Sequence, residues 1–509
     1  MTSRLLGLVR EQVLAFLFGA GSEMDAFNVA FRIPNLFRDL FAEGAMSAAF
    51  VPAFTRRLSR GGRDEAWRLG TYVISALLVI TLALVAVGLV FARPLVTLFA
   101  SDYAAVPGKL ELTVQLTRVL FPFLTLVAVA AACMGMLNSL HRFFLPALSP
   151  VMFNVATIAC AIVLVPVMPL VHLPRIMAIA IGALVGGVGQ VALQWVPLRR
   201  EGFRYRPALD TRDEGLRQVL VLMGPGLVGL AAVQINLFVN TVLATGQGTG
   251  AVSWLNYAFR LMYMPIGLFG VSVATAALPT LSRQAATGDL TGMGQTVSSG
   301  LRMMLMLNVP ATAGLIALAW PIVALLFQHG SFTRTDTAAT AVALACYAPG
   351  LVGYSAVRFA APAFYALHDS RTPVAVSIAT VLLNATLSLA LVRAIGYPGL
   401  ALGTAIASLF NATLLLWLLG ARLDGLEGRR IAAAFAKIAA ASLVMGAVVW
   451  QADATLALVI RGEAVLARLV RVSIDITLAL GVLAAAARAL RIAEFADAVK
   501  IVRRRMLGT

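Results

Sequence analysis

Long apolar segments separated by short polar loops run along the whole chain. Each segment is near the roughly 20 residues that a helix needs to cross the hydrocarbon core of a bilayer. The fourteen segments are 3–20, 25–54, 72–100, 112–138, 143–168, 172–198, 216–243, 250–281, 298–328, 338–366, 373–393, 397–420, 430–450 and 464–488. Their Leu, Ala and Val runs are too long for the alternating strands of a membrane barrel. The pattern therefore predicts an all-α polytopic membrane protein with about fourteen transmembrane helices.

The first segment is unusually polar, because it contains Arg4, Arg10 and Glu11. These charges interrupt the apolar core that a secretory signal peptide requires, so we interpret the segment as a helix of the mature protein. It starts almost at Met1, which leaves open a true start upstream of Met1.

Composition agrees with a membrane location. Of the 509 residues, 60% are hydrophobic and only 12% are charged, and the mean hydropathy is +0.89. Soluble domains carry about 25% charged residues. The net charge of +17 does not indicate a nucleic-acid partner, because the cations lie in loops between apolar spans rather than in one patch.

Arginine is concentrated in alternate loops, as the positive-inside rule expects for the cytoplasmic side. With fourteen spans, both termini fall on that side, together with the arginine-rich loops near 56–68 and 199–217. The opposite loops contain few cations: Lys109, Arg175, Arg334, Arg393 and Arg461. The sequence therefore predicts that both termini are cytoplasmic.

The chain also repeats itself. Residues Asn28–Arg32 (Asn-Val-Ala-Phe-Arg) recur as Asn256–Arg260 (Asn-Tyr-Ala-Phe-Arg), at an offset of 228. Further pairs follow at an offset of 227: Pro52 and Pro279, Pro94 and Pro321, Pro122 and Pro349, and His141 and His368. An ordered series at one offset indicates a duplication.

Each repeat spans six helices, and an even number preserves orientation. The halves are therefore expected to be parallel and related by a pseudo-two-fold axis along the membrane normal. We expect an N-lobe at 1–205, a C-lobe at 206–422, and a segment 423–509 with two further helices and a cytoplasmic tail. Transporters built in this way bind substrate near the midplane, between the lobes.

Several arginines fall inside predicted spans: Arg4, Arg10, Arg32, Arg38, Arg260 and Arg358. An arginine at the centre of a transmembrane helix costs roughly 2.5–3.5 kcal/mol on insertion scales. Its planar guanidinium binds two phosphate oxygens at once and stays charged at physiological pH. These positions predict a water-filled cavity that binds an anion; internal ion pairs that lower the insertion cost are the alternative.

Polar neighbours of the arginines are candidates for gating or orienting roles. They are Asp25, Asn35 and Glu43, all in the second predicted span. Asp25 opens that span and is equally a candidate N-terminal cap. Both roles of Asp25 stay open.

Side-chain amides lie in later spans: Gln234, Asn236, Asn240, Asn384 and Asn411. They either bond helices together or line a cation site. Enzymatic motifs are missing: there is no Asp-rich pair for a magnesium-bound diphosphate, no glycine-rich phosphate loop, and no metal-ligand spacing among the histidines. The sequence predicts a transporter rather than an enzyme, without a metal or cofactor.

The run Asp25–Pro52 (Asp-Ala-Phe-Asn-Val-Ala-Phe-Arg-Ile-Pro-Asn-Leu-Phe-Arg-Asp-Leu-Phe-Ala-Glu-Gly-Ala-Met-Ser-Ala-Ala-Phe-Val-Pro) closely resembles the signature of the MurJ/MviN lipid II flippases. Segments within Ser253–Leu261 and Ala361–Pro373 are also similar to that family. These flippases belong to the MATE-like exporter superfamily. The resemblance extends over nearly the whole chain.

The resemblance implies a bacterial inner-membrane flippase that moves the undecaprenyl-diphosphate-linked peptidoglycan precursor from the cytoplasmic to the periplasmic leaflet. It matches the family's central-cavity arginines to Arg4, Arg10, Arg38 and Arg260, and a basic position to Arg358. It matches acidic positions to Asp25 and Glu43. The last two spans would form a groove for the lipid tail. The chain departs from some relatives at Phe259 and Tyr263, where those proteins carry carboxylates.

The implied partners are lipid II, membrane lipids and, as a further expectation, proteins of cell-wall synthesis. Coupling to the membrane potential or to a monovalent cation is left open. Two alternatives also remain: a flippase for another polyprenyl-diphosphate-linked saccharide, and a MATE-like drug or cation exporter. The exporter is expected to have an acid-dominated cavity, the opposite of the arginine-rich spans seen here.

The arginine asymmetry predicts the topology. Reporter fusions after Arg68, Arg206 and Arg505 should read cytoplasmic, and a fusion at Gly248 should read periplasmic. A periplasmic signal at Arg206 would contradict the fourteen-span arrangement.

Overall fold

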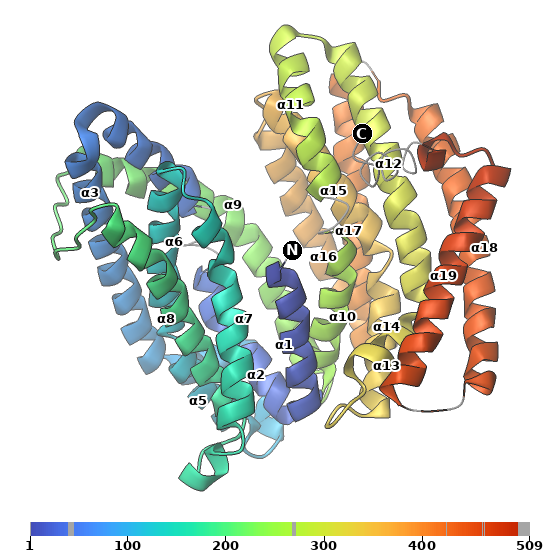
Figure 1. Ribbon diagram of the computed structural model, residues 1–509, viewed down its shortest axis with the longest axis horizontal. Helices are drawn as coiled ribbons and strands as arrows, with labels where there is room; N and C mark the ends of the chain where they lie inside the picture. The colour runs from blue at the N-terminus through green and yellow to red at the C-terminus, as the bar shows by residue number, and fades with distance from the viewer. Residues whose placement is uncertain are drawn as a thin grey trace. The chain divides into compact units, whose positions relative to one another are not determined.

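The computed structural model describes residues 2–38, 45–266, 271–423, 425–460, 462 and 464–496, and these residues form helices and loops without a β-strand (Figure 1). The chain divides into two compact units, Met1–Ser253 and Trp254–Thr509. The prediction of an all-α membrane protein is confirmed.

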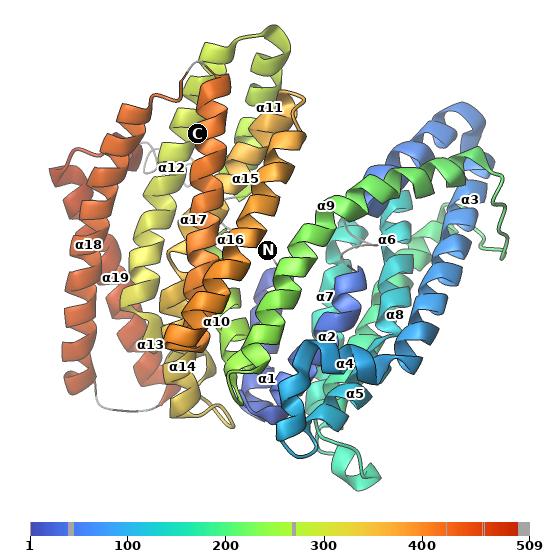
Figure 2. The ribbon, with the colours of Figure 1, turned by 180° about the vertical axis from the view of Figure 1, so that it is seen from behind.

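The N-terminal unit contains nine α-helices among its described residues, followed by the start of a tenth. They are α1 (Thr2–Phe18), α2 (Ser22–Arg38), α3 (Ala45–Val90), α4 (Ala92–Ala100), α5 (Lys109–Leu120), α6 (Phe123–Ser139), α7 (Phe144–Leu164), α8 (Met177–Arg200) and α9 (Glu214–Thr245). In this unit α7 packs on α8, α3 on α6, and α2 on α5. Figure 2 shows α9 running beside α3 and α4, which it contacts. An aromatic cluster joins α3 to the loop after α8: Phe54 packs on Trp67, and Trp67 packs on Phe203.

The C-terminal unit contains most of α10 and nine further helices among its described residues. They are α10 (Ala251–Pro265), α11 (Val271–Thr287), α12 (Leu290–Ala317), α13 (Ala319–Phe327), α14 (Arg334–Tyr347), α15 (Gly350–Ala366), α16 (Arg371–Ile395), α17 (Tyr397–Arg422), α18 (Gly428–Val459) and α19 (Val465–Ala489). Here α16 packs on α17, α15 on α17, and α18 on both α12 and α19. The buried side chains of Ile438, Met445 and Val449 pack α18 against the hydrophobic core of this unit.

The sequence repeat recurs in the secondary structure. The short helices α4 and α13 stand at an offset of 227, as do α6 and α15. The turns that follow α6 and α15 both contain a histidine with φ of 58°, His141 and His368. Left-handed backbone is uncommon outside glycine, so this shared detail indicates that the two segments fold alike. The rotation that relates the two lobes stays a prediction.

Several predicted spans are divided differently. The segments 72–100 and 298–328 each end early, at Val90 and Ala317, and continue as the separate helices α4 and α13. The spans around Pro122 and Pro349 break into α5 with α6 and α14 with α15; the second pair is bent by 44°. Proline lacks the amide hydrogen that a continuous helix needs, and it clashes with the preceding turn.

Among the described residues, nine helical segments are long and apolar enough to cross a membrane, and the bent pair α14–α15 makes a tenth. The predicted spans 3–20, 25–54, 216–243 and 250–281 are not among these ten segments, and the last three include side chains or whole residues that the structure does not describe. The number fourteen stays a prediction.

The division into compact units differs from the repeat-based one. The unit boundary lies after Ser253 rather than after residue 205, because α9 packs on α3 and α4 of the N-terminal unit. The lobes 1–205 and 206–422, with 423–509 outside them, follow the duplication instead and stay a prediction.

Close helix packing in the C-terminal unit depends on Gly353. A Cβ atom at this position would lie 2.5 Å from the backbone carbonyl of Ser408 on α17, where no side chain can give way. Gly353→Ala should therefore destabilise the protein by about 1–3 kcal/mol, measured as a lower melting temperature in detergent. Gly481→Ala on α19 is the matched control, because no atom lies within 4 Å of its Cβ. Equal melting temperatures for the two variants would contradict this packing.

Candidate functional site

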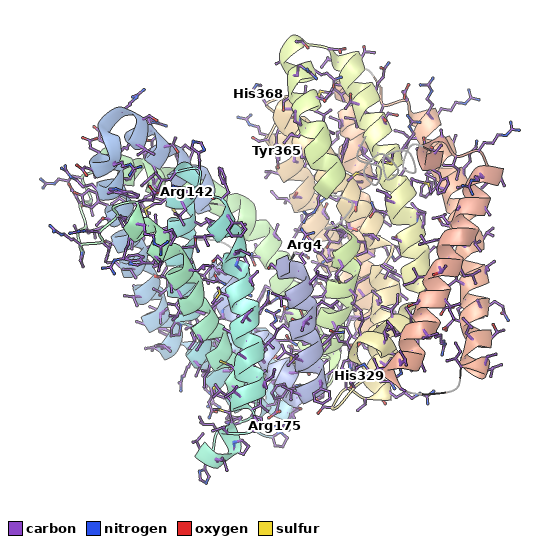
Figure 3. All side chains as sticks on the ribbon, in the orientation of Figure 1. Arg4, Arg142, Arg175, His329, Tyr365 and His368 are labelled. Carbon is purple, nitrogen blue, oxygen red and sulfur yellow. The ribbon has the colours of Figure 1, made fainter. Side chains whose placement is uncertain are left out.

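Arg4 and Arg10 lie on α1 of the N-terminal unit. Arg4 is exposed near the start of the helix (Figure 3). Arg10 is buried; its Nε lies 3.2 Å from Oε1 of Glu11, and its guanidinium lies 5.0 Å from the ring centroid of Phe153. Glu11 is also buried, and the sequence had given it no role in the site. The Arg10–Glu11 pair has no net charge, which is what the alternative of an internal ion pair expects.

Arg32, Asn35 and Arg38 lie on α2, and all three are partly buried. Oδ1 of Asn35 is buried without a hydrogen-bond partner among the described residues. Arg38 is the last residue of the helix, so its guanidinium is placed where a helix C-terminus favours a cation. Glu43 lies outside the described residues, so its role stays a prediction.

A polar cluster surrounds Asp25, which is fully buried. Its Oδ2 accepts from Nζ of Lys109 at 2.9 Å and from the backbone N–H of Gly250 at 2.7 Å. Its Oδ1 accepts from Ser253, from the backbone N–H at 3.1 Å and from Oγ at 2.7 Å. Because α10 begins at Ala251, Asp25 caps the start of α10 although it belongs to the first turn of α2. The sequence suggested a cap for the helix that Asp25 opens, whereas the carboxylate caps a helix more than 200 residues away in the sequence. Its predicted gating role stays a prediction.

Lys109 is the functional candidate that sequence reasoning missed, because it was counted only as a loop cation. Its side chain is 2% exposed, and its ammonium lies 4.1 Å from the ring centroid of Tyr103. Burial, and to a lesser extent the Asp25 charge, raise the pKa of Tyr103 well above 10.0, so the phenol stays neutral under the ammonium. A signal was present: Lys109 is one of three lysines in a chain that otherwise uses arginine.

Arg260 and Arg358 lie in the C-terminal unit, on α10 and α15. Arg260 is partly buried and Arg358 is exposed. The guanidinium of Arg358 donates to the Tyr263 hydroxyl and lies 5.3 Å from its ring centroid. Phe259 stacks on Tyr263 with centroids 5.6 Å apart. Phe259 and Tyr263 therefore form an aromatic surface that holds an arginine.

The amides are shared between the two units. Gln234 and Asn240 lie on α9 of the N-terminal unit, whereas Asn384 and Asn411 lie on α16 and α17 of the C-terminal unit. Asn384 is buried and accepts from Ser388, while Oδ1 of Asn411 has no partner among the described residues. Neither unit contains all four, so a cation site built from them stays a prediction. The described residues contain no cluster of three or more metal-ligating side chains.

The arginines fall into two sets. The N-terminal unit carries Arg4, Arg10, Arg32 and Arg38, and the C-terminal unit carries Arg260 and Arg358. Within each unit the structure shows partners that fix Arg10 and Arg358, as described above. That all six line one cavity stays a prediction.

Both the sequence and the fold of this chain resemble those of known proteins. The family model described as lipid II flippase MurJ matches residues 14–491. The chain is 35% identical over 463 residues to a probable lipid II flippase MurJ of Vibrio cholerae, covering 89% of this chain and 87% of that protein.

Solved structures agree. A lipid II flippase MurJ in an inward closed conformation superimposes with a TM-score of 0.78 at 26% identity, over 96% of this chain and 97% of that one. A multidrug resistance MATE family transporter in an inward-facing conformation gives a TM-score of 0.71 at 17% identity, over 84% of this chain and 96% of that one. The latter likeness concerns the fold alone. The chain belongs to the lipid II flippase MurJ family.

Proposed function

We propose that this protein is a lipid II flippase of the bacterial inner membrane, with both termini in the cytoplasm. It moves the undecaprenyl-diphosphate-linked precursor from the cytoplasmic to the periplasmic leaflet by alternating access. The observation that carries the proposal is the family match over residues 14–491, which spans both repeats and both C-terminal helices.

The distribution of charge supports this substrate. Six candidate arginines lie inside predicted spans, five of them in the spans 3–20, 25–54 and 250–281, and Arg358 lies on α15. A diphosphate carrying sugars requires such wet, cationic helices, because guanidinium groups form bidentate hydrogen bonds with phosphate oxygens. Such helices would repel the cationic substrate of a cation exporter. The likeness to the MATE family transporter concerns only the fold.

The surface of α19 supports a site for the lipid tail. An open groove of about 790 Å³ runs along this helix, and its lining is predominantly apolar. Leu469, Ile474 and Val482 are among the residues that form it. A polyprenyl chain can remain in such a groove, in contact with lipid, while the head group crosses the polar interior. This division of labour gives α18 and α19, which lie outside the repeat, a role in transport.

In the gating proposal the ion pair of Asp25 and Lys109 is called the latch, because it is a contact that holds helices together and can open. The carboxylate ties α2 and α5 to the first turn of α10 through a buried ion pair and three further hydrogen bonds. Opening this contact would expose or unpair both charges, so it is a step that substrate or an ion can control. Coupling to the membrane potential or to a monovalent cation stays a prediction, as do contacts with cell-wall synthesis proteins.

The arginines are tested by Arg10→Ala, Arg38→Ala and Arg260→Ala. Each should abolish complementation of a depleted strain and weaken precursor binding on the order of 10- to 100-fold, since a hydrogen bond to a charged group contributes about 1.5–3 kcal/mol. Lysine should restore binding only in part, because it lacks the two-pronged geometry. Binding and flipping by purified protein are the measurements, and Arg393→Ala, at the exposed end of α16, is the control. Normal flipping by all three alanine variants would refute the diphosphate site.

The Arg10 result has its own discriminating control. If Arg10 acts only as the partner of Glu11, the double variant Arg10→Ala with Glu11→Gln removes both charges and should recover transport. If Arg10 binds the diphosphate, the double variant stays inactive.

The latch is tested by Asp25→Asn, Lys109→Met and the double variant. Each single change leaves one buried charge without its partner, which typically costs 3–5 kcal/mol, so both should lower the melting temperature. The double variant should recover thermal stability but not transport. Recovery of transport as well would show that the pair serves folding alone.

A further inference from the structure

The two C-terminal helices contain a buried acid that the proposed function does not use. α18 and α19 lie side by side in the C-terminal unit (Figure 1), and α19 also packs on α13. Asp475, in the middle of α19, has an exposed fraction of 0%. Within the described part of the chain, no N–H or O–H donor reaches either of its carboxylate oxygens.

The neighbour of this acid is a second acid. The Asp453 carboxyl on α18 is close enough to Asp475 to act on it electrostatically. Asp453 is itself held by Arg471, one turn before Asp475 on α19, with Nε of Arg471 2.5 Å from Oδ1 of Asp453. The side chains of Asp453 and Arg471 are 15% and 23% exposed. Two acids therefore share one guanidinium in a largely dehydrated contact between α18 and α19.

Two other helices pack here, α12 on α18 and α13 on α19. The single ionisable side chain of α12 is Arg302, and it is bound to Glu494, beyond the end of α19. The described residues of α13 include no ionisable side chain. Arg468, one turn nearer the start of α19, donates to the backbone carbonyls of Ala324 and Gln328 at the end of α13. If both acids were ionised, the triad would carry one uncompensated negative charge, and two carboxylates would face each other without a hydrogen between them. Such a burial is costly, and proteins avoid it by protonating one partner.

A cavity reaches Arg471, the basic member of this triad. It has a volume of about 140 Å³, lies where the α18–α19 loop meets α13 and α14, and is lined by Arg471 and Val472 together with Gln328, Arg334 and Arg468. One ordered water needs roughly 10–15 Å³ on this measure, so the cavity has room for several. Its polar lining supplies hydrogen-bond partners for them.

We propose that Asp453 and Asp475 together bind one exchangeable proton, which enters and leaves through this cavity. In the loaded state the carboxyl O–H of Asp475 donates to the Asp453 carboxylate, and Arg471 neutralises that carboxylate, so the triad has no net charge. On release the proton passes to water in the cavity, and the triad becomes an anion of charge −1. The loaded state holds α18 and α19 together, and the unloaded state weakens their contact. The site lies outside the two repeats and does not depend on the nature of the transported molecule.

The test is infrared difference spectroscopy on the full-length protein in lipid bilayers, recorded between acidic and alkaline pH. The wild type should show a carbonyl band of a protonated carboxylic acid that disappears as the pH rises. Asp475→Asn preserves the shape and can still donate a hydrogen bond to Asp453, so it should fold while losing this band. Asp453→Asn should lose the shared-proton band as well, which keeps the test decisive if one variant fails to accumulate. Asp64→Asn, an exposed acid on α3, is the control and should leave the band unchanged.

Thermal unfolding gives a second readout. Deprotonation places an unpaired charge in a buried contact, so the melting temperature of the wild type should fall as the pH rises through the titration. Asp475→Asn should remove that part of the dependence, and Asp64→Asn should not. If the infrared spectra of the wild type and Asp475→Asn have the same carboxylic acid band, both acids are ionised throughout and the proposal is wrong.

Discussion

Asp25 accepts four hydrogen bonds from three residues in two distant segments, and one ammonium balances its charge. A carboxylate with no exposed surface is tolerated only when it is paired and fully hydrogen-bonded. The arrangement consequently fixes several things at once: the start of α10, the end of the loop before α5, and the first turn of α2. The same constraint applies to two other buried charges. Arg10 on α1 forms an ion pair with Glu11, and Arg471 on α19 forms one with Asp453 on α18.

The duplication explains how such a contact arose between distant parts of the sequence. Asp25 and Ser253 are separated by the repeat offset of 228, so they are counterparts in the two copies that now contact one another. Asn28, one turn further along α2, also donates to the Ser253 hydroxyl at 3.1 Å. An acid in both copies would bring two carboxylates together, whereas an acid facing a hydroxyl gives a donor and an acceptor. The different residues at this one pair of positions therefore make the contact complementary.

Sequence reasoning recovered the features that follow from the bilayer and missed those that follow from packing. Apolar periodicity predicted the helical class, and the series from Asn28 to His368 predicted the repeated element order, because hydropathy and duplication are written directly in the residues. Proline positions such as Pro349 indicated bends, although a run of apolar residues cannot show that a helix ends and a short one begins. The partnership of Asp25 with Lys109 could not be predicted, since nothing local relates a loop cation to an acid 84 residues earlier. Asp475 was equally hidden, because a single acid in an apolar span gives no sign of which acid it will face.

The way each arginine is held determines what charge it can offer a substrate. Arg10 is paired with the buried carboxylate of Glu11, so its charge is already balanced within α1. Arg358 is held by the ring and hydroxyl of Tyr263, which carry no formal charge. An aromatic partner orients the guanidinium by cation–π attraction and leaves its full charge available. The aromatic residues Phe259 and Tyr263 therefore orient Arg358 without neutralising it, whereas Glu11 balances the charge of Arg10.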